Sequence, residues 1–236
     1  LHIITGCATH PGGISGLHIG VSEFYVRAGG KLTFTMVHNW GEEVHVRPRT
    51  AVMVEAGGTY IANYLLLRPV RSVQMYPTVT LNGEGAVARL QSILIAHPGC
   101  ELDVGGRVIL KAPHTRAEVI ARTLAIGGYS MARGHLVGLV PDIKAHLECR
   151  GLIMGNGVVY AIPELEGRAA GVDMSHEAAV GKIAAEEVEY LMARGLDEEE
   201  AVSTIVRGFL NVKIEGLPPA LEAEMEQAIQ ASGQGL

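Results

Sequence analysis

The sequence is short of cysteine, of aromatic residues and of positive charge, and each shortage excludes a class of protein. Its 236 residues include three cysteines, Cys7, Cys100 and Cys149, an odd and sparse set that cannot form a disulfide framework. We therefore expect a reducing compartment, the cytoplasm, with thiols free for metal or sulfur chemistry. Aromatic residues make up 5% of the chain, so stacking platforms for single-stranded nucleic acid are not expected. The formal net charge of −6 argues against binding to duplex DNA.

Long apolar runs and two common catalytic motifs are also missing. No stretch of about 18 uncharged apolar residues is present and no signal peptide opens the chain, so we expect no association with a membrane. The sequence contains neither the Gly-x4-Gly-Lys-Ser/Thr motif that binds ATP nor the Gly-x-Ser-x-Gly motif of a serine nucleophile. The first residue is Leu1 rather than methionine, from which we expect that an N-terminal portion precedes it.

Charge divides the chain into two parts. Residues 1–160 carry 14 Lys+Arg and 10 Asp+Glu, a net charge of +4, whereas residues 161–236 carry 5 and 15, a net charge of −10. The two values sum to the −6 of the whole chain. Such asymmetry predicts two units with different surfaces.

The first part has the pattern of β-structure. Short runs such as Leu32–Met36 alternate apolar and polar residues, and glycine or proline recurs between the runs. A near-period of 14, with a doubled period of 28, is typical of a β-solenoid, in which each turn buries the apolar face of its neighbour. A sandwich or barrel is the alternative, with strands that recur every 8–12 positions or so. The spacing of 14 is clearest at Gly99, Pro113, Gly127, Pro141 and Gly155.

The last part, residues 176–236, has the pattern of helices. A first helix is predicted over Ala184–Arg194, with Gly195 as its stop. A second begins at Asp197 and Glu200, which are spaced as in a capping box. An amphipathic stripe follows in this second helix. The stripe consists of Val202, Ile205, Val206, Phe209 and Leu210.

A third helix is predicted from Pro219 to about Ala231. Because the helices follow the strands instead of alternating with them, the predicted fold class is mostly β, of the α+β type. We place a β-solenoid core in residues 1–165 and a C-terminal helical region in residues 166–236.

The cysteines are the first candidates for chemistry. Strict alternation over Lys144–Arg150 places Cys149 on the same face as Ala145 and Leu147, so its thiol is either a buried structural group or lies along the edge of the apolar face. Cys7 and His10 form a Cys-x-x-His pair, which is weak for zinc because no second pair follows. Cys100 follows a Pro-Gly turn and is given no role.

Histidine and carboxylate residues give further candidates. His176 and Glu177 are suitable ligands for iron or zinc at the seam between the two parts. The same segment also suits the start of a helix, with Ser175 as its N-cap and Glu177 in its first turn. His38 and His45 loosely resemble a cupin metal motif, but the closely spaced first pair of histidines is absent.

Several short motifs, spread over nearly the whole chain, together resemble the SufB/SufD family of iron–sulfur cluster assembly proteins, and most of all its SufB-like members. The motifs are Gly6-Cys7-Ala8, Val37-His38-Asn39-Trp40, Met75-Tyr76-Pro77, Asp103-Val104-Gly105, Arg133-Gly134-His135-Leu136-Val137, Glu148-Cys149-Arg150-Gly151-Leu152, Ser175-His176-Glu177-Ala178-Ala179-Val180-Gly181-Lys182-Ile183, Tyr190-Leu191-Met192-Ala193-Arg194-Gly195-Leu196 and Ile205-Val206-Arg207-Gly208-Phe209.

The resemblance implies a right-handed parallel β-helix core, a C-terminal helical region that binds the ABC-type ATPase SufC, and an N-terminal domain of the family that is absent here. It implies no enzymatic activity in this chain: ATP is used only through SufC. It also implies a transient iron–sulfur cluster, sulfur from a cysteine desulfurase system as donor, and pairing with a second copy or with a SufD-like subunit.

The resemblance also assigns roles to individual residues. Cys7 matches the position that accepts sulfur as a persulfide, and Cys149 matches the scaffold cysteine at the subunit interface. His176 and Glu177 match an interface pair, so the implied ligands of iron are Cys149, His176 and Glu177. Cys149 and Glu177 together favour SufB over SufD.

An open strand edge is predicted in residues 141–160, an apolar segment in which Arg150 is the only central charge. Unpaired strand edges invite pairing with another chain, so we expect a dimer that brings Cys149 of one chain near His176 or Glu177 of the other.

Two rival functions remain open: a structural SufD-like partner without a cluster of its own, and a β-helix enzyme that acts on carbohydrate, such as a lyase or acyltransferase.

Overall fold

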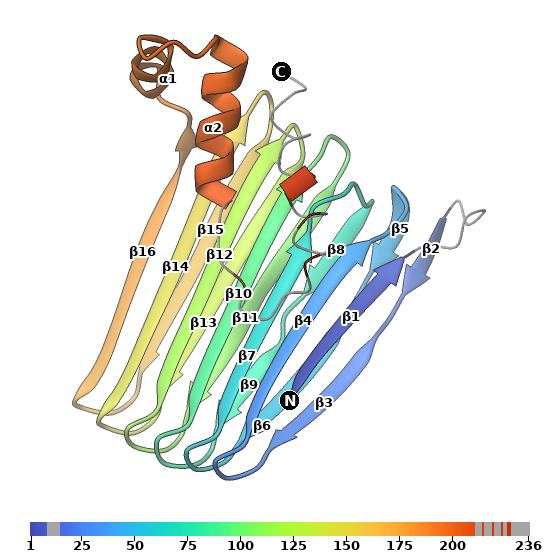
Figure 1. Cartoon of the computed structure of the whole chain (residues 1–236). Helices are drawn as coiled ribbons and strands as arrows, with labels where there is room; N and C mark the ends of the chain where they lie inside the picture. The colour runs from blue at the N-terminus through green and yellow to red at the C-terminus, as the bar shows by residue number, and fades with distance from the viewer. Residues whose placement is uncertain (9–14, 211–213, 215–218, 220–222, 224–225, 228–236) are drawn as a thin grey trace.

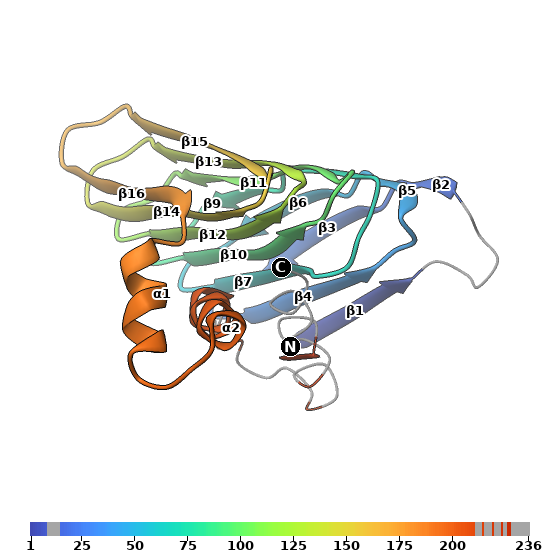
Figure 2. The same cartoon turned by 90° about the horizontal axis from the view of Figure 1, so that it is seen from above.

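Two facing parallel sheets form the body of the molecule. The computed structural model describes residues 1–8, 15–210, 214, 219, 223 and 226–227, and it is mostly β, a parallel β-solenoid of about six turns followed by helices (Figure 1). Seen from above, the two sheets lie as two layers, and each turn of the chain adds a strand to both (Figure 2). The solenoid that the spacing of glycine and proline predicted is confirmed.

In the described residues the first sheet has seven strands, all paired in parallel. Their order across the sheet is β1 (His2–Ala8), β4 (Lys31–Asn39), β7 (Thr59–Leu66), β10 (Val87–Ala96), β12 (Arg116–Ile126), β14 (Ile143–Met154) and β16 (Val172–Lys182).

The second sheet has nine described strands, and several are halves of one turn interrupted by a short break. Pro77 lies in such a break, where it removes a backbone N–H from the ladder opposite β11. The strands are β2 (Ser15–His18), β3 (Val21–Val26), β5 (Glu43–Val46), β6 (Arg49–Val54), β8 (Ser72–Met75), β9 (Thr78–Leu81), β11 (Glu101–Leu110), β13 (Tyr129–Gly138) and β15 (Val158–Gly167).

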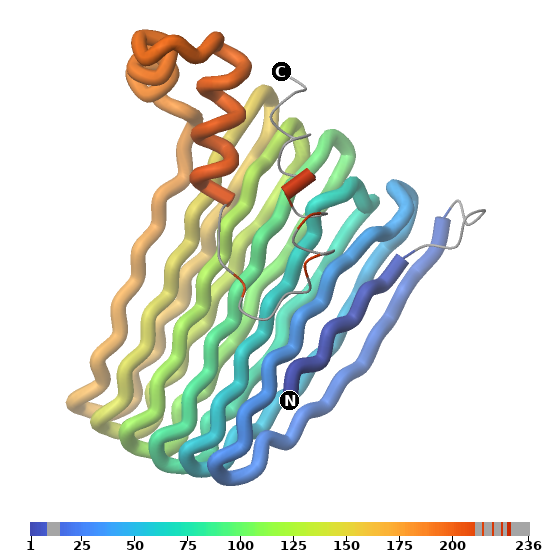
Figure 3. The backbone as a smooth tube through the Cα atoms, viewed as in Figure 1, coloured from blue at the N-terminus to red at the C-terminus, as the bar shows by residue number. Residues whose placement is uncertain are grey.

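The doubled period of the sequence is visible in the strand register. Thr59 pairs with Val87, and Val87 in turn pairs with Arg116, so each turn advances the chain by nearly the same length. One corner of each turn places a residue in the left-handed region, where glycine is favoured. Two turns use His114 and Asp142 there instead, with φ of 59° and 57°. The path of the chain therefore repeats even where the residue type does not (Figure 3).

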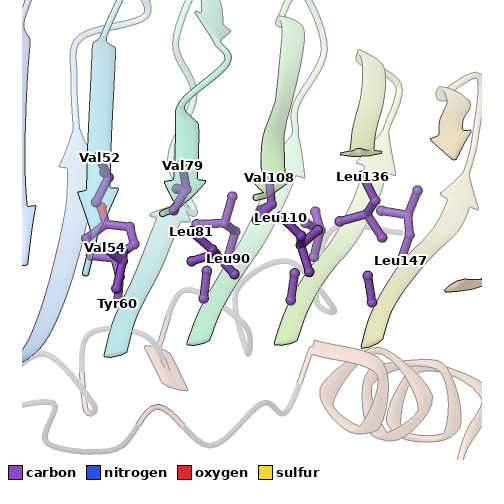
Figure 4. Close-up of a cluster of buried hydrophobic side chains, with 14 of the residues drawn as sticks. Val52, Val54, Tyr60, Val79, Leu81, Leu90, Val108, Leu110, Leu136 and Leu147 are labelled. Carbon is purple, nitrogen blue, oxygen red and sulfur yellow. The ribbon is translucent and has the colours of Figure 1, made fainter. Parts of the chain in front are cut away.

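The core lies between the two sheets. Alternate residues of each strand point inward, and aligned positions of successive turns stack, as the labelled side chains in Figure 4 show. Val79, Val108 and Leu136 meet Leu90 and Leu147 from the opposite layer. This stacking fixes which residues face the interior, and so it fixes the direction of every candidate site residue on a strand.

The helical region begins later than predicted. β16 carries the first sheet to Lys182, so the expected boundary at residue 165 and the helical interpretation of residues 176–182 are wrong. The two described helices are α1 (Ala185–Met192) and α2 (Glu198–Leu210). The predicted third helix lies largely outside the described residues. Neither described helix is long and apolar enough to cross a membrane.

The start of α2 has the capping contacts that its sequence predicts. The backbone N–H of Glu200 donates to Asp197 Oδ1 at 2.8 Å, and the N–H of Asp197 donates to Glu200 Oε2 at 3.1 Å, so the capping box is confirmed. Gly195 ends the preceding turn with φ of 101°. Helix α1 lies beyond the C-terminal tip of β16. Helix α2 then runs back across the outer face of the first sheet (Figures 1 and 2).

The apolar stripe of α2 packs on the molecule's own sheet. Val206 and Leu210 are buried against residues of β7, β10 and β12, and Val202 and Phe209 pack on the same cluster. The stripe is thus largely covered within the chain. Little of it is left for contact with another protein.

Candidate functional site

Cys7 lies on the inner face of β1, at the first turn of the solenoid. It is aligned with His38 of β4, and its strand neighbours Ile3 and Thr5 are aligned with the inward Phe34 and Met36. The thiol is half-buried, and this burial raises its pKa above the ordinary value. Cys7 is therefore mainly a neutral thiol near pH 7.

Aromatic and imidazole rings surround His38. The side chain is 3% exposed, and its Nδ1 shares a hydrogen bond of 3.0 Å with the Tyr64 hydroxyl of β7. The Trp40 ring lies between two imidazoles, with its centroid 5.5 Å from that of His38 and 4.6 Å from that of His18. Burial, aided by the nearby charge of His18, lowers the pKa of His38 to about 4, so this imidazole is neutral near pH 7.

Cys149 lies at the other end of the solenoid, on the inner face of β14. The alternation predicted this direction: the residue is 1% exposed and belongs to the main apolar core. Burial, together with the carboxylate of Glu148, raises the pKa of its thiol to about 11. In the single chain Cys149 is a protonated, covered thiol.

The open edge is displaced by one strand from where the sequence placed it. The expected edge in residues 141–160 is wrong for the first sheet, because β16 pairs with β14 along its whole length. The last strands of the two sheets are β15 and β16. Cys149 therefore sits one strand inside the edge, aligned with Ala178 of β16.

His176 and Glu177 are within β16. Ser175 does not cap a helix, and Glu177 is not in a first helical turn, so that alternative is wrong. His176 is aligned with the inward Leu147, whereas Glu177 is aligned with Glu148 on the opposite face of the sheet. Both side chains are exposed because β16 has no further strand beside it among the described residues.

The three implied iron ligands are not brought together within one chain. Cys149 and His176 belong to the inner-facing positions of neighbouring strands, and Glu177 to the outer-facing ones. Throughout the described part of the chain, no group of three or more His, Cys, Asp and Glu residues is arranged to hold a metal ion. A site made from all three residues needs groups from a second chain or a rearrangement of the edge.

A chain of ion pairs runs over the outer face to Glu177. Arg150 Nη2 donates to Glu177 Oε1 at 2.9 Å, and Arg150 Nε lies 3.0 Å from Glu148 Oε1. Arg122 Nη2 is 3.6 Å from the same oxygen, and its Nη1 donates to the Phe209 carbonyl oxygen of α2 at 3.1 Å. The end of α2 is thereby tied to the edge carboxylate through β12 and β14.

The interior connects the two ends through one row of aligned residues. The row starts at Thr5, two positions before Cys7, and ends at Cys149. Five strand steps separate β1 from β14, a span of about 24 Å at the usual spacing between strands. A cavity of about 40 Å³ is lined by members of this row, namely Tyr64, Ser92 and Ala121.

Sequence reasoning missed Tyr64 and the arginines. The signal for Tyr64 was the repeat itself, which aligns it with Met36 of the preceding turn. Arg150 was noted only as a charge on the edge, and no sequence pattern paired it with Glu177, because that contact depends on the register between β14 and β16.

Comparisons with known proteins agree on one group. The family model described as "SUF system FeS cluster assembly, SufBD core domain" matches residues 1–209. An iron–sulfur cluster assembly SufBD family protein of Methanothermobacter thermautotrophicus is 53% identical over 238 residues, covering all of this chain and 58% of that protein. One of Archaeoglobus fulgidus is 49% identical over 237 residues, covering all of this chain and 64% of that protein.

A more distant relative is the iron–sulfur cluster assembly protein SufB of Bacillus subtilis. It is 31% identical over 241 residues, which cover all of this chain and 51% of that protein. The chain thus spans between about half and two thirds of the length of these relatives.

Proposed function

Because the chain belongs to the SufBD family of iron–sulfur cluster assembly proteins, we propose that it is a non-enzymatic scaffold that accepts sulfur at Cys7 and builds a nascent cluster at Cys149. The observation that carries this proposal is the placement of Cys149 beside the edge strand that bears His176 and Glu177. Soft thiolate, imidazole and carboxylate together form a ligand set that iron accepts. Iron and sulfide are the cargo of such a site.

The cluster site is completed by a second chain. In the described single chain Cys149 lies on β14, whereas His176 and Glu177 lie on the two faces of β16, and the edge backbone groups of β16 have no neighbouring strand. The last turn also exposes apolar side chains, which is unusual for a surface that stays in water. These are Val158, Tyr160, Leu165 and Val180. Pairing with a second copy, or with a SufD-like subunit, covers this rim and brings a second set of ligands to the join.

The ATPase partner, SufC, docks on α1 and the adjoining turn. None of the residues of α1 is buried, and its Tyr190 and Met192 are 59% and 43% exposed. Glu186 and Glu187 give the helix an acidic first turn. An exposed aromatic and methionine pair with charged surroundings is the composition of a protein-binding surface. In a pull-down, Tyr190→Ala with Met192→Ala should release SufC, whereas Tyr160→Ala on β15 should not.

The sulfur that enters at Cys7 has to cover about 24 Å to reach Cys149. The small side chains of Ser92 and Ala121 line the cavity on that line, and they leave the interior less filled there than in the apolar core. A relay through this space is the shortest path within one chain. The donor of the sulfur is a persulfide-bearing protein of the cysteine desulfurase type.

A structural SufD-like role is the second candidate, and one observation favours it. Cys149 is 1% exposed, so a chain that never opens its last turn would hold no cluster. Under that role the chain would only complete the site of a different, SufB-like subunit.

Anaerobic reconstitution with ferrous iron and sulfide separates the two roles. The scaffold should develop visible sulfur-to-iron charge-transfer absorption, and Cys149→Ala should abolish it while the fold persists, because the change removes little volume. Cys100→Ala is the matched control, since Cys100 is also buried but belongs to a different apolar cluster. Absorption that survives in Cys149→Ala removes the ligand assignment, and absence of absorption in the unaltered chain supports the structural role.

A further inference from the structure

Three polar side chains lie near one another on the inner face of the first three turns. Cys7 and His38 are register partners on β1 and β4, so their Cα atoms are separated by about one strand spacing, roughly 4.8 Å. Tyr64 on β7 reaches back to His38 Nδ1 at 3.0 Å. The Cys7 side chain is also near enough to Tyr64 to raise the pKa of its hydroxyl, in addition to the larger effect of burial. Thiol, imidazole and phenol thus lie on three neighbouring strands, with Tyr64 two residues before Leu66, the register partner of His38.

The position of these three groups bears on how a protonated Cys7 thiol can attack sulfur. Only a thiolate attacks sulfur, yet burial raises the pKa of Cys7 and keeps it protonated near pH 7. A neutral thiol attacks sulfur slowly, so a neighbouring base that takes its proton speeds the attack. His38 is 3% exposed and uncharged near neutral pH, so its ring has a lone pair available for a proton.

Taking Cys7 as the sulfur acceptor of the proposed function, we propose that His38 is the general base for its thiol and that Tyr64 is the positioning residue that fixes the required tautomer. When His38 Nδ1–H donates to the Tyr64 oxygen, the lone pair of the ring is on Nε2. The order of groups, a nucleophile, a base and a third group that orients the base, is the general arrangement of an activated nucleophile.

The transfer balances without an oxidant or reductant. Nε2 of His38 takes the Cys7 proton as the Cys7 sulfur attacks the outer sulfur of the donor persulfide, R–S–SH. The S–S bond of the donor breaks, its electron pair leaves with R–S⁻, and a new S–S bond forms on Cys7. The imidazolium then returns its proton to R–S⁻, so the products are the Cys7 persulfide and R–SH.

Donor groups nearby suit the product. Trp40 Nε1 and Thr5 Oγ1 are buried without a hydrogen-bond partner in the described part of the chain. Both atoms are N–H or O–H donors, which a persulfide anion on Cys7 can use. Among the described residues, the titratable groups that face His38 are Cys7 on β1, Tyr64 on β7 and His18 on β2. A positive charge on His18 opposes one on His38 and keeps the base in its neutral form.

The test is the pH dependence of Cys7 reactivity in the whole chain. Methyl methanethiosulfonate is an uncharged probe that places a methylthio group on a thiolate, and mass spectrometry of peptides resolves Cys7, Cys100 and Cys149. With His38 as base, the rate at Cys7 should be flat between about pH 6 and pH 8. In His38→Gln it should fall about 100-fold at pH 7 and then rise about tenfold per pH unit, because only the spontaneous thiolate reacts.

Two further variants keep the test decisive. Tyr64→Phe preserves the ring and should slow Cys7 about tenfold while the profile stays flat, because the base remains but its tautomer is no longer fixed. His45→Gln is the control: His45 also bonds a hydroxyl, Ser72 Oγ at 2.8 Å, but it lies on β5 of the second sheet. Its Cys7 rate should equal that of the unaltered chain. Circular dichroism verifies the fold of each variant.

Equal rates in His38→Gln and the unaltered chain, or a flat profile in both, overturn the base assignment. An unchanged rate in Tyr64→Phe overturns the positioning role of Tyr64. Loading with inorganic polysulfide separates this inference from the proposed function. If His38→Gln slows the probe but the unaltered chain takes no sulfur onto Cys7, the base stands and the proposed sulfur entry fails. If sulfur is taken up equally by both chains, the entry stands and the base fails.

Discussion

The two cysteines of the proposed function face the same interior from opposite ends of one solenoid, and their surroundings differ in kind. Cys7, on the first turn, is half-buried beside a neutral imidazole and a phenol. Cys149, near the last turn, is covered by apolar side chains and has a carboxylate as its nearest charge. Under the proposed function, the first end holds the groups for sulfur transfer in the single chain, whereas the second must gain groups or open before it can hold iron.

The difference lies in the side chains that fill the core at each end of the solenoid. At the first turn the imidazole and aromatic side chains of β2, β4 and β7 fill the end of the core. Both ends of the described solenoid leave open strand edges with exposed apolar side chains. These are Leu17, Val21 and Tyr25 at the first turn and Tyr160, Leu165 and Val180 at the last. The core itself ends in apolar side chains around Cys149 at the last turn. A core end that holds imidazole and phenol groups suits chemistry on a small reactant, whereas an apolar core end has no group that can act as a base.

The largest expected effect concerns packing at the last turn. Leu147 precedes Cys149 by two residues on β14 and is fully buried in the same apolar core, so Leu147→Ala should lower the free energy of unfolding by about 2–5 kcal/mol. Ile3→Ala at the first turn should cost about 1 kcal/mol, since Ile3 is only partly buried. Urea denaturation of both variants measures the contrast. Equal losses would mean that the two ends are packed alike.

Acid should weaken the molecule through its first end. Burial depresses the folded-state pKa of His38 to about 4, below the 6.5 of a free imidazole. Stability from its neutral form is therefore complete above about pH 6.5 and is lost as the pH falls toward 4, by about 3 kcal/mol. Urea midpoints of the unaltered chain should drop over this window. In His38→Gln that part of the drop should vanish, and an unchanged drop would place its cause elsewhere.

Alkali should weaken the metal-free molecule through its second end. Burial raises the folded-state pKa of Cys149 from 9.0 to about 11. The stability held by the protonated thiol is complete below about pH 9 and is lost as the pH rises through 11, by about 2–3 kcal/mol. Denaturation of Cys149→Ala between these pH values should lack this loss. Cys100→Ala, which leaves Cys149 intact, should retain it.

The smallest effect concerns the ion pairs on the outer face. Arg150→Met should cost about 1 kcal/mol, because its partner Glu177 is 54% exposed at the side chain and its more buried partner Glu148 keeps the pair with Arg122. The matched control is Lys144→Met, which removes an ammonium 3.9 Å from Asp173 where both side chains are largely exposed, and it should change nothing measurable.

Hydrogen exchange in α2 should rise in Arg122→Met, which removes the bond to the Phe209 carbonyl. Unchanged exchange would mean that this bond does not hold the helix end.

The sequence carried the repeat but not the last strand. Turn residues at a regular spacing follow from a chain that must bend at the same corner in every coil, so the solenoid was predictable. Ser175, His176 and Glu177 match a helix start in residue type, yet the unpaired edge of β14 offers a full ladder of hydrogen bonds to residues 172–182. Tertiary pairing overrode the local pattern there.

The candidate site was predictable to the same extent. Alternation alone placed Cys149 inward, because it depends only on the period of a strand. The neighbours of Cys7 and Glu177 depend on register, and register was not written in any local motif. The first coil, which runs from Cys7 to its register partner His38, is longer than the coils that follow it. Even the repeat would therefore have missed that pair.

The central claim, a cluster built between two chains from Cys149 of one and His176 with Glu177 of the other, is tested most directly by mixing inactive variants. Cys149→Ala and the double variant His176→Ala, Glu177→Ala should each fail in anaerobic reconstitution. Unfolded together and refolded as a mixture, they should recover about one quarter of the charge-transfer absorption of the unaltered chain, because half of the dimers are mixed and each has one intact site of two. No recovery in a mixture that does form mixed dimers would contradict the account.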